Sequence, residues 1–240
     1  MLNGELIVPG DYDATLHFAV EHFITTCRMA IQDHGQFFVA LSGGSTPKAI
    51  YEVLCQPDYN SEIEWDKVHL FWSDERSVPP TSPDSNYHMA MKAGFEKMLL
   101  VPQHIHRMVA ETEIEKNALE YEKKIIKILN GQSFDLIMLG MGEDGHTASL
   151  FPGTEALKSN GRLVVANHVP QKDTWRMTLT FDCINDAAQT VFYVMGKSKA
   201  EMMVRVFTAQ PLLPCQLVGT SDHPALWIAD EAAAALIPNS

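Results

Sequence analysis

The sequence predicts one α/β domain in which a mainly parallel sheet is doubly wound, with helices on both of its faces. Compact apolar runs typical of buried strands alternate along the chain with segments whose apolar residues recur at helical spacing. Several of these runs lead directly into loops rich in glycine, serine and proline. Strands that alternate with helices indicate a parallel sheet covered on both sides. No repeat or linker divides the 240 residues, so we expect a single domain over residues 1–240.

The N-terminal part begins with a short apolar strand at residues 6–8, followed by a long helix. Asp11 or Asp13 can cap this helix, because a short carboxylate side chain accepts hydrogen bonds from free backbone N–H groups. Gly35 should end it, since glycine readily adopts the left-handed conformation found at helix C-termini. The apolar residues recur at helical spacing, at Leu16, Val20, Phe23, Ile24 and Cys27.

Two further strand–helix units follow. Residues 37–41 form an apolar run before a glycine-rich turn, and Pro47 suits the first turn of the next helix. The apolar run at residues 68–72 continues into SDERSVPPTSPDSN, which is so rich in turn formers that we expect a loop. The next helix should therefore start only at about Tyr87. Long loops that follow strands often carry function.

The clearest helix in the chain begins after Thr112 and ends near Gly131. Thr112 and Glu115 have the spacing of a capping box, and the helix has an apolar stripe formed by Ile114, Ala118, Tyr121, Ile125 and Ile128. A strand at residues 134–139 follows. The remaining pattern predicts strands at residues 163–165, 177–180, 190–195 and 226–229, with helices from about Lys197 and after Asp230.

Composition excludes several classes of protein. The formal net charge is −12, from 18 basic and 30 acidic residues, and this disfavours a nucleic-acid partner, which requires a cationic face. The start of the chain lacks the pattern of a signal peptide, and no apolar stretch approaches the length of a membrane span. The four cysteines have neither disulfide-framework nor zinc-site spacing. We therefore expect a cytoplasmic protein that binds neither nucleic acid nor membrane. The sequence does not distinguish a monomer from a small homo-oligomer.

A glycine-rich turn at residues 42–47 follows the second strand and opens a helix. Backbone N–H groups at a helix N-terminus attract anions, and glycines allow a ligand to approach the backbone. Gly43, Gly44, Ser45 and Thr46 are therefore candidate phosphate-binding residues. A plain tight turn with a helix cap is an equally good interpretation of this segment taken alone.

The segment at residues 140–145 matches the dinucleotide fingerprint G-x-G-x-x-G and follows a strand. That fingerprint requires a sustained helix after its third glycine, whereas Pro152 and Gly153 interrupt the chain within about two turns. The expected acidic residue about 20 positions further on is also missing. We therefore expect no nicotinamide cofactor.

Candidate catalytic side chains follow the strands. His146 lies just beyond the glycines and close to Asp144, and imidazole is well suited to take a proton from water near neutral pH. Asp74 and Arg76 follow the strand at residues 68–72, and Glu75 between them should lie at the same sheet edge. Arg76 could bind an anionic group or an oxyanion. A structural histidine and a solvated ion cluster are the alternatives.

Two more cations, Arg176 and Lys199, border predicted strands and could point into the same crevice, although a surface position is the default for either. His104 and His106 have the spacing of a metal pair, but no further ligands can be assigned to them, so no metal site is expected. The chain has no G-x-S-x-G nucleophile elbow and no cysteine–histidine pair. Direct attack by water is thus favoured over a covalent intermediate.

Taken together, successive blocks of the chain resemble the 6-phosphogluconolactonase family in that family's order. The resemblance spans about residues 40–236, and the combination of GMGEDGHTASLFPGT with SDER is specific for it. It implies a Rossmann-like doubly wound fold of the sugar-phosphate isomerase type and the hydrolysis of 6-phosphogluconolactone, in the oxidative pentose phosphate pathway, without a cofactor. By resemblance, the base is His146, the phosphate loop is Gly43 to Thr46, and the cationic contacts are Arg76, Arg176 and Lys199.

Two other functions remain to be weighed. Glucosamine-6-phosphate isomerase has a similar Asp-Gly-His element, but by resemblance it carries an acidic residue where this chain has Phe151. Asp74 is retained, so that residue alone does not exclude a proton-transferring isomerase. A non-catalytic sugar-phosphate sensor is disfavoured, because such sensors commonly carry a DNA-binding extension and no helix-turn-helix segment is recognisable.

The resulting hypothesis gives each candidate residue a role. The loop at Ser45 and Thr46 holds the phosphate together with Lys199 and Arg176, and this binding positions the lactone carbonyl. His146 then deprotonates the attacking water, with Asp144 as a residue that could orient the imidazole. Arg76 and loop N–H groups stabilise the oxyanion.

Overall fold

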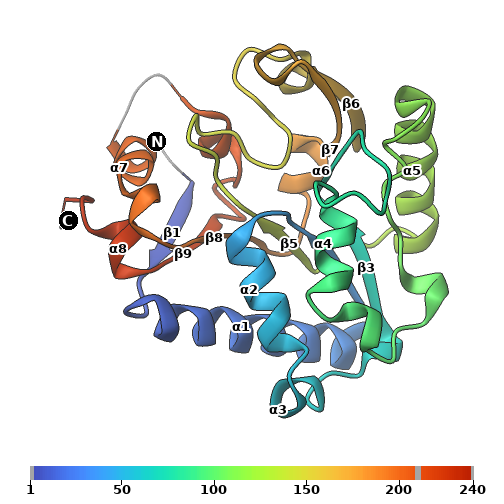
Figure 1. Ribbon diagram of the computed structural model, residues 1–240, viewed down its shortest axis with the longest axis horizontal. Helices are drawn as coiled ribbons and strands as arrows, with labels where there is room; N and C mark the ends of the chain where they lie inside the picture. Colours follow the sequence, from blue (N-terminus) through green and yellow to red (C-terminus); the bar gives the residue numbers. More distant parts are fainter. Residues whose placement is uncertain (1–2, 209–211, 239–240) are drawn as a thin grey trace.

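A six-stranded parallel sheet forms the centre of the protein in a computed structural model that describes residues 3–208 and 212–238. Every neighbouring pair in this sheet is parallel. The strands lie in the order β1 (Gly4–Ile7), β9 (Ala225–Ala229), β8 (Thr190–Val194), β5 (Leu136–Leu139), β2 (Phe37–Leu41) and β3 (Val68–Trp72). The predicted doubly wound α/β fold is confirmed (Figure 1).

Helices cover both faces of the sheet. They are α1 (Tyr12–His34), α2 (Ser45–Leu54), α3 (Pro57–Asn60), α4 (Asn86–Lys92), α5 (Ile114–Leu129), α6 (Phe181–Asn185), α7 (Ala200–Thr208) and α8 (Glu231–Ala234). Short 3-10 helices span Trp65–Lys67, Phe95–Lys97, Pro102–His104, Glu155–Lys158, Pro170–Lys172, Lys197–Lys199 and Pro214–Leu217. Figure 1 shows α1 along one side of the sheet and α7 on the other.

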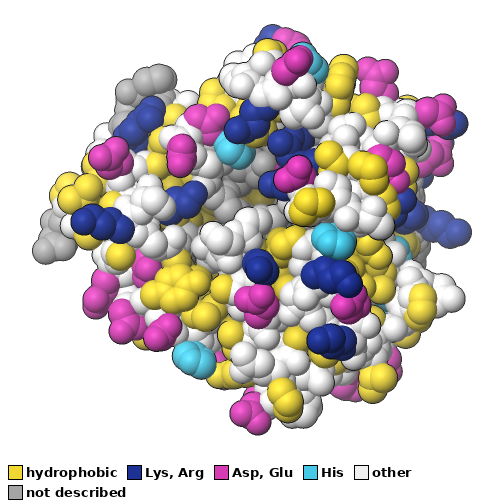
Figure 2. All heavy atoms as spheres, viewed as in Figure 1, with side chains coloured by type: hydrophobic (Ala, Val, Ile, Leu, Met, Phe, Trp, Pro, Cys, Tyr) yellow, Lys and Arg dark blue, Asp and Glu magenta, His cyan; other side chains and the backbone are white. Residues whose placement is uncertain are grey.

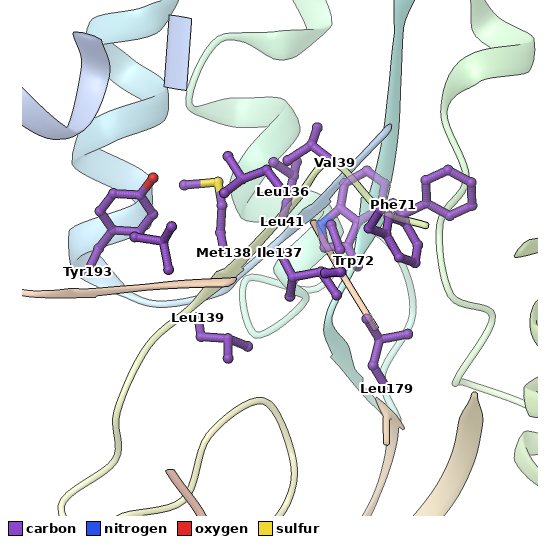
Figure 3. Packing of buried hydrophobic residues seen from close by; sticks show 14 of the residues in the cluster. Val39, Leu41, Phe71, Trp72, Leu136, Ile137, Met138, Leu139, Leu179 and Tyr193 are labelled. Carbon is purple, nitrogen blue, oxygen red and sulfur yellow. The ribbon is translucent and has the colours of Figure 1, made fainter. Parts of the chain in front are cut away.

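Neighbouring residues of one strand show how the two layers form. Side chains alternate across a strand, so Phe71 and Trp72 of β3 point to opposite faces. Trp72 packs against Tyr87 of α4 with ring centroids 5.3 Å apart, whereas Phe71 packs against Tyr121 of α5 at 6.2 Å. Figure 3 shows the same alternation in β5, where Met138 and Leu139 point in opposite directions. Both faces are apolar because both are buried.

A second sheet was not expected from the sequence. It is antiparallel, with the order β4 (Asp74–Arg76), β7 (Thr174–Leu179) and β6 (Val164–Val169). The runs at residues 163–165 and 177–180 therefore do not join the central sheet, and part of the loop after β3 is a strand. Acidic residues are rare in strands, which conceals β4 in the sequence.

Most helix boundaries follow the expected caps, with one exception. The Asp11 side chain accepts a hydrogen bond from the Ala14 N–H at 3.0 Å, and Gly35 ends α1 with φ 89°. The predicted capping box of Thr112 and Glu115 does not form. Glu113 occupies the N-cap position of α5 in the left-handed conformation, and its side chain makes no capping hydrogen bond. The Thr112 carbonyl accepts a hydrogen bond from the Asn117 side chain at 2.6 Å.

The strand order determines where a crevice opens at the edge of the sheet. The chain moves outward from β2 to β3 and then returns to the other side of β2 to form β5. The loops after β2 and β5 therefore lead away from each other, and a crevice opens between them at the carboxyl ends of the strands. The glycine-rich segments 42–47 and 140–145 follow these two strands.

Candidate active site

A cleft of about 310 Å³ lies at the carboxyl ends of β2 and β5. It gathers side chains that are far apart in the sequence, from the loops after β2 and β5, from β4 and β7, and from the residues before α7. Figure 2 shows a hollow on this face with Lys and Arg side chains around its rim. The predicted site residues that line the cleft are Gly43, Gly44, Ser45, Thr46, Asp74, Arg76, His146, Arg176 and Lys199.

The glycine-rich turn after β2 presents the N-terminus of α2 to the cleft. Gly44 precedes the helix with φ 105°, a conformation that favours glycine, and Ser45 and Thr46 form the first turn. At Gly43 a side chain would overlap with the amide of Asn86. Free backbone N–H groups at this position favour an anion in the cleft.

Asp144 lies outside the cleft lining but holds the ring of His146. Its Oδ1 is 2.5 Å from His146 Nδ1 and also accepts a hydrogen bond from the His146 backbone N–H at 3.1 Å. Partial burial opposes the charge on Asp144, but these hydrogen bonds prevail and lower the pKa of its carboxyl group. An ionised carboxylate can only accept, so Nδ1 carries a proton, and in the neutral imidazole the lone pair is then on Nε2. Such a tautomer suits a general base.

The His146 ring also lies against Phe151, which sequence reasoning did not assign to the site. The two rings are stacked, with centroids 3.9 Å apart and an angle of 19° between their planes. Phe151 is 3% exposed and lines the cleft. The sequence block around His146 contained this residue, but nothing in its spacing indicated a stack.

Two arginines face the cleft from neighbouring strands. Arg76 of β4 and Arg176 of β7 are directly paired in the antiparallel register. The Nε atoms of both are buried without a hydrogen-bond partner among the described residues. Burial, followed by the charge of Arg76, lowers the pKa of Arg176. Only the outer end of Arg76 is held, because its Nη1 donates to the Asp84 carbonyl at 2.6 Å. This arrangement favours an anionic ligand.

Asp74 and Glu75 diverge, although the sequence predicted both at one edge. Asp74 faces the cleft, where it accepts hydrogen bonds from the Asn86 amide at 3.0 Å and the Ser149 hydroxyl at 2.6 Å. Glu75 is 3% exposed and accepts hydrogen bonds at the start of α4 from the Ser85 hydroxyl and the Tyr87 N–H. Burial raises the pKa of Glu75 despite these hydrogen bonds. Glu75 is therefore a structural residue, because neighbours on a strand point to opposite sides.

Further polar residues complete the cleft. The Lys199 ammonium donates to the Met141 carbonyl at 2.8 Å, which ties the loop after β5 to the residues before α7. Lys172, between β6 and β7, lines the cleft but was not predicted. Ser149 and Asn86 were also missed. Ser149 follows His146 by three residues, so its place in that loop was the one available indication.

The two histidines considered as a metal pair lie elsewhere. His104 stacks on His69 with ring centroids 3.7 Å apart, and His69 Nδ1 is 3.1 Å from His106 Nε2. Within residues 3–208 and 212–238, no group of three or more His, Cys, Asp or Glu residues is arranged to hold a metal ion. The cluster lies on the face of the sheet that carries Phe71, because His69 of β3 contacts Phe38 and His106 contacts Phe71.

Comparison with known proteins decides the family. The family model for glucosamine-6-phosphate isomerases/6-phosphogluconolactonase matches residues 10–227. The chain belongs to this family. The 6-phosphogluconolactonase of Chlamydia pneumoniae is 41% identical over 218 residues, which cover 89% of this chain and 83% of the relative. The 6-phosphogluconolactonase of Nostoc sp. is 36% identical over 235 residues, which cover 94% of this chain and 95% of the relative.

Solved structures of the glucosamine-6-phosphate isomerase/6-phosphogluconolactonase family share the fold. The 6-phosphogluconolactonase of Thermotoga maritima superimposes with a TM-score of 0.81 at 28% identity, covering 94% of this chain and 98% of that one. A monomeric glucosamine-6-phosphate deaminase has a TM-score of 0.81 at 19% identity, covering 97% and 99%. The latter likeness concerns the fold alone. The described residues contain no helix that could cross a membrane.

Proposed function

We propose that this protein hydrolyses 6-phospho-D-glucono-1,5-lactone to 6-phosphogluconate in the pentose phosphate pathway. Its relatives at 41% and 36% identity are named 6-phosphogluconolactonase. The observation that carries the proposal is the His146–Asp144 pair beside a cleft that also holds Arg76, Arg176, Lys172 and Lys199. A general base next to a cationic cleft suits the addition of water to an anionic ester.

The reaction begins with water held by His146. Nε2 accepts a proton from the water as its oxygen bonds to the lactone carbonyl carbon, and the carbonyl oxygen takes up the negative charge. Arg76 stabilises this oxyanion. When the tetrahedral intermediate collapses, the bond to the ring oxygen breaks, and the imidazolium returns its proton to that oxygen. Asp144 keeps the imidazole in the required tautomer throughout and stabilises its charged form.

Substrate binding is assigned to the loop after β2 and to two cations of the cleft. The N–H groups and hydroxyls at Ser45 and Thr46 hold the phosphate together with Lys199 and Arg176. This remote binding energy places the carbonyl carbon beside His146. Asp74 neutralises part of the positive charge around the arginines, and its hydrogen bonds to Asn86 and Ser149 fix its position. No cofactor enters the proposed steps.

We also propose that the protein works in the cytoplasm, since Cys27, Cys55, Cys183 and Cys215 are all free thiols. Amino-sugar isomerisation is disfavoured, because the stacked phenyl ring of Phe151 carries no acid that could assist His146. A phenyl ring can neither donate nor accept the proton that ring opening requires.

The deciding experiment follows the hydrolysis of freshly generated 6-phosphogluconolactone in the presence of a chelator. Wild type, His146→Ala and an enzyme-free blank are compared, because the lactone also hydrolyses unaided. We expect His146→Ala to lower kcat by about 10²–10⁴-fold, the usual contribution of a general base. A wild-type rate no higher than the blank would overturn the lactonase, and turnover of glucosamine 6-phosphate would then be measured. An undiminished kcat in His146→Ala would overturn the assigned base.

The phosphate assignment has its own test. Lys199→Ala should raise KM with little change in kcat, because a contact made equally in the ground and transition states affects binding alone. An unchanged KM would remove Lys199 from the binding site.

A further inference from the structure

The hydrogen bond that His146 donates to Asp144 does not by itself fix the plane of the imidazole ring. The contact at Nδ1 selects the tautomer, but the ring turns about its Cβ–Cγ bond in a broad torsional well, and one hydrogen bond limits that rotation only loosely. Among the described residues, no side chain is hydrogen-bonded to His146 Nε2. Another contact must therefore set the plane of the ring and the direction of its lone pair.

We propose that Phe151 is the positioning residue that fixes the plane of His146. This inference rests on the proposed function, in which His146 is the base. The stacked contact, at 3.9 Å between centroids and 19° between planes, opposes rotation of the imidazole about its Cβ–Cγ bond, because tilting one flat ring drives it into the other. The backbone of Gly142 closes on the same ring, since a side chain there would overlap with the imidazole.

Phe151 is itself held by the neighbouring sheet. Its carbonyl accepts hydrogen bonds from the Thr154 hydroxyl at 2.8 Å and the Thr154 N–H at 3.2 Å. The amide of Asn167, a residue of β6 that is 2% exposed, donates to the Thr154 hydroxyl and to the Ser149 carbonyl. These hydrogen bonds anchor the segment that carries Phe151 to β6 on both sides of the ring. The stack is thus supported by buried polar contacts rather than by a mobile loop.

The phenyl ring also suits the chemistry of the base. His146 becomes an imidazolium after it takes the proton from water, and the face of an aromatic ring attracts a cation. Phe151 offers no donor or acceptor, so among residues 3–208 and 212–238 Asp144 remains the only carboxylate bonded to the imidazole. A second carboxylate at position 151 would favour the protonated ring before water is bound, and a protonated ring cannot act as a base.

The test combines Phe151→Leu, which removes the flat face, with Phe151→Tyr, which retains it. Phe134→Leu is the matched control, because Phe134 is similarly buried but packs against Phe71 and does not line the cleft. We expect Phe151→Leu to lower kcat by about 10- to 100-fold, the range typical of a misplaced catalytic group. The Kd for 6-phosphogluconate, measured by calorimetry, should change little. Phe151→Tyr should restore most of the rate.

A second comparison separates positioning from a general structural effect. If Phe151 acts through His146, then Phe151→Leu should cause no further loss in a His146→Ala background. Histidine-selective ¹⁵N NMR gives a readout that does not need turnover. The ring signals of His146 should be sharp in wild type and Phe151→Tyr but broadened in Phe151→Leu, where the plane of the ring is no longer fixed. The tautomer protonated at Nδ1 should persist in all three proteins, because Asp144 selects it.

The outcomes distinguish this inference from the proposed function. An inactive wild type with the expected NMR spectra would overturn the lactonase but support the positioning. An undiminished kcat in Phe151→Leu beside an inactive His146→Ala would overturn only the positioning. A loss equal to that in Phe134→Leu, or a further loss in the double variant, would also overturn it.

Discussion

Arg76 and Arg176 lie directly opposite each other in the antiparallel pair of β4 and β7, and both turn toward the cleft. Like charges at such a position destabilise a sheet. Both Nε groups are buried without a partner in the described part of the chain, so part of their hydrogen-bonding capacity is unused. Asp74 and Glu75 offset some of the charge on Arg176. The pair is therefore arranged for an anionic ligand at some cost to the unliganded fold.

Arg176→Gln should separate the effect of the arginine pair on stability from its effect on anion binding. Without an anion, the free energy of unfolding should rise by about 0.2–1 kcal/mol, because a like-charge pair across two strands is relieved. The affinity for 6-phosphogluconate should fall by about 10- to 100-fold, as expected for the loss of a charged hydrogen bond. Urea unfolding and calorimetry measure the two quantities.

Arg107→Gln is the matched control, since Arg107 pairs with Glu111 outside the cleft. It should leave the affinity unchanged. Unchanged affinity in Arg176→Gln, or a loss of stability without ligand, would contradict the assignment of the arginine pair to anion binding.

Asp144→Asn tests the tautomer of His146. The asparagine side chain keeps the size of Asp144 but can place an N–H opposite Nδ1, which would favour a proton at Nε2. The lone pair would then point away from the attacking water. We expect kcat to fall by at least about 10-fold, with KM little changed. A kcat within error of wild type would show that the hydrogen bond from His146 Nδ1 to Asp144 does not control the base.

The sequence correctly predicted those site residues that directly follow a strand of the central sheet. Gly43 to Thr46 follow β2 and His146 follows β5, so their convergence results from parallel strands that end at one edge. The opposite directions of Asp74 and Glu75 could not be predicted, because they depend on β4 and its register with β7. That register pairs Asp74 with Thr178, about 100 residues away.

Other parts of the site depend on contacts that leave no periodic pattern. Phe151 follows His146 by five residues, but their stack depends on hydrogen bonds between the intervening loop and Asn167 of β6. Lys172 reaches the cleft because β6 and β7 form a hairpin, and this pairing was not recognised. The fold class was still predicted correctly without the pairing of β6 with β7, because the strands of the central sheet are apolar on both faces and easily identified.

Acid should destabilise the protein through the histidine cluster behind β3. Burial, followed by neighbouring histidines, lowers the pKa of His69 to about 4 and that of His106 to about 3. Lys124 also disfavours a charge on His106, and burial lowers the pKa of His104 although Asp66 opposes this. These groups stay neutral in the folded protein but bind protons at about pH 6.5 when unfolded. The free energy of unfolding should therefore fall as pH decreases from about 6.5 to about 4.

Urea unfolding between pH 7.5 and 4.5 measures this dependence. Each histidine can contribute at most about 1.4 kcal/mol per pH unit within the window. His106→Gln should give a shallower dependence than wild type, whereas the exposed His223 can be replaced by glutamine without effect. Equal slopes in wild type and His106→Gln would show that other groups cause the acid sensitivity.

Gly142→Ala should reduce activity through His146 alone. The backbone at Gly142 does not have the positive φ of a left-handed conformation, so alanine causes no conformational strain there. Its methyl group would instead overlap with the His146 ring and displace Nε2 from the attacking water. A shift of about 1 Å in a catalytic group can cost about 10²-fold in rate. Gly140→Ala is the control, because its methyl group meets only Ser42 Oγ at 3.9 Å. Steady-state kinetics should show a large loss of kcat in Gly142→Ala and a small one in Gly140→Ala, and equal losses would contradict the steric role of Gly142.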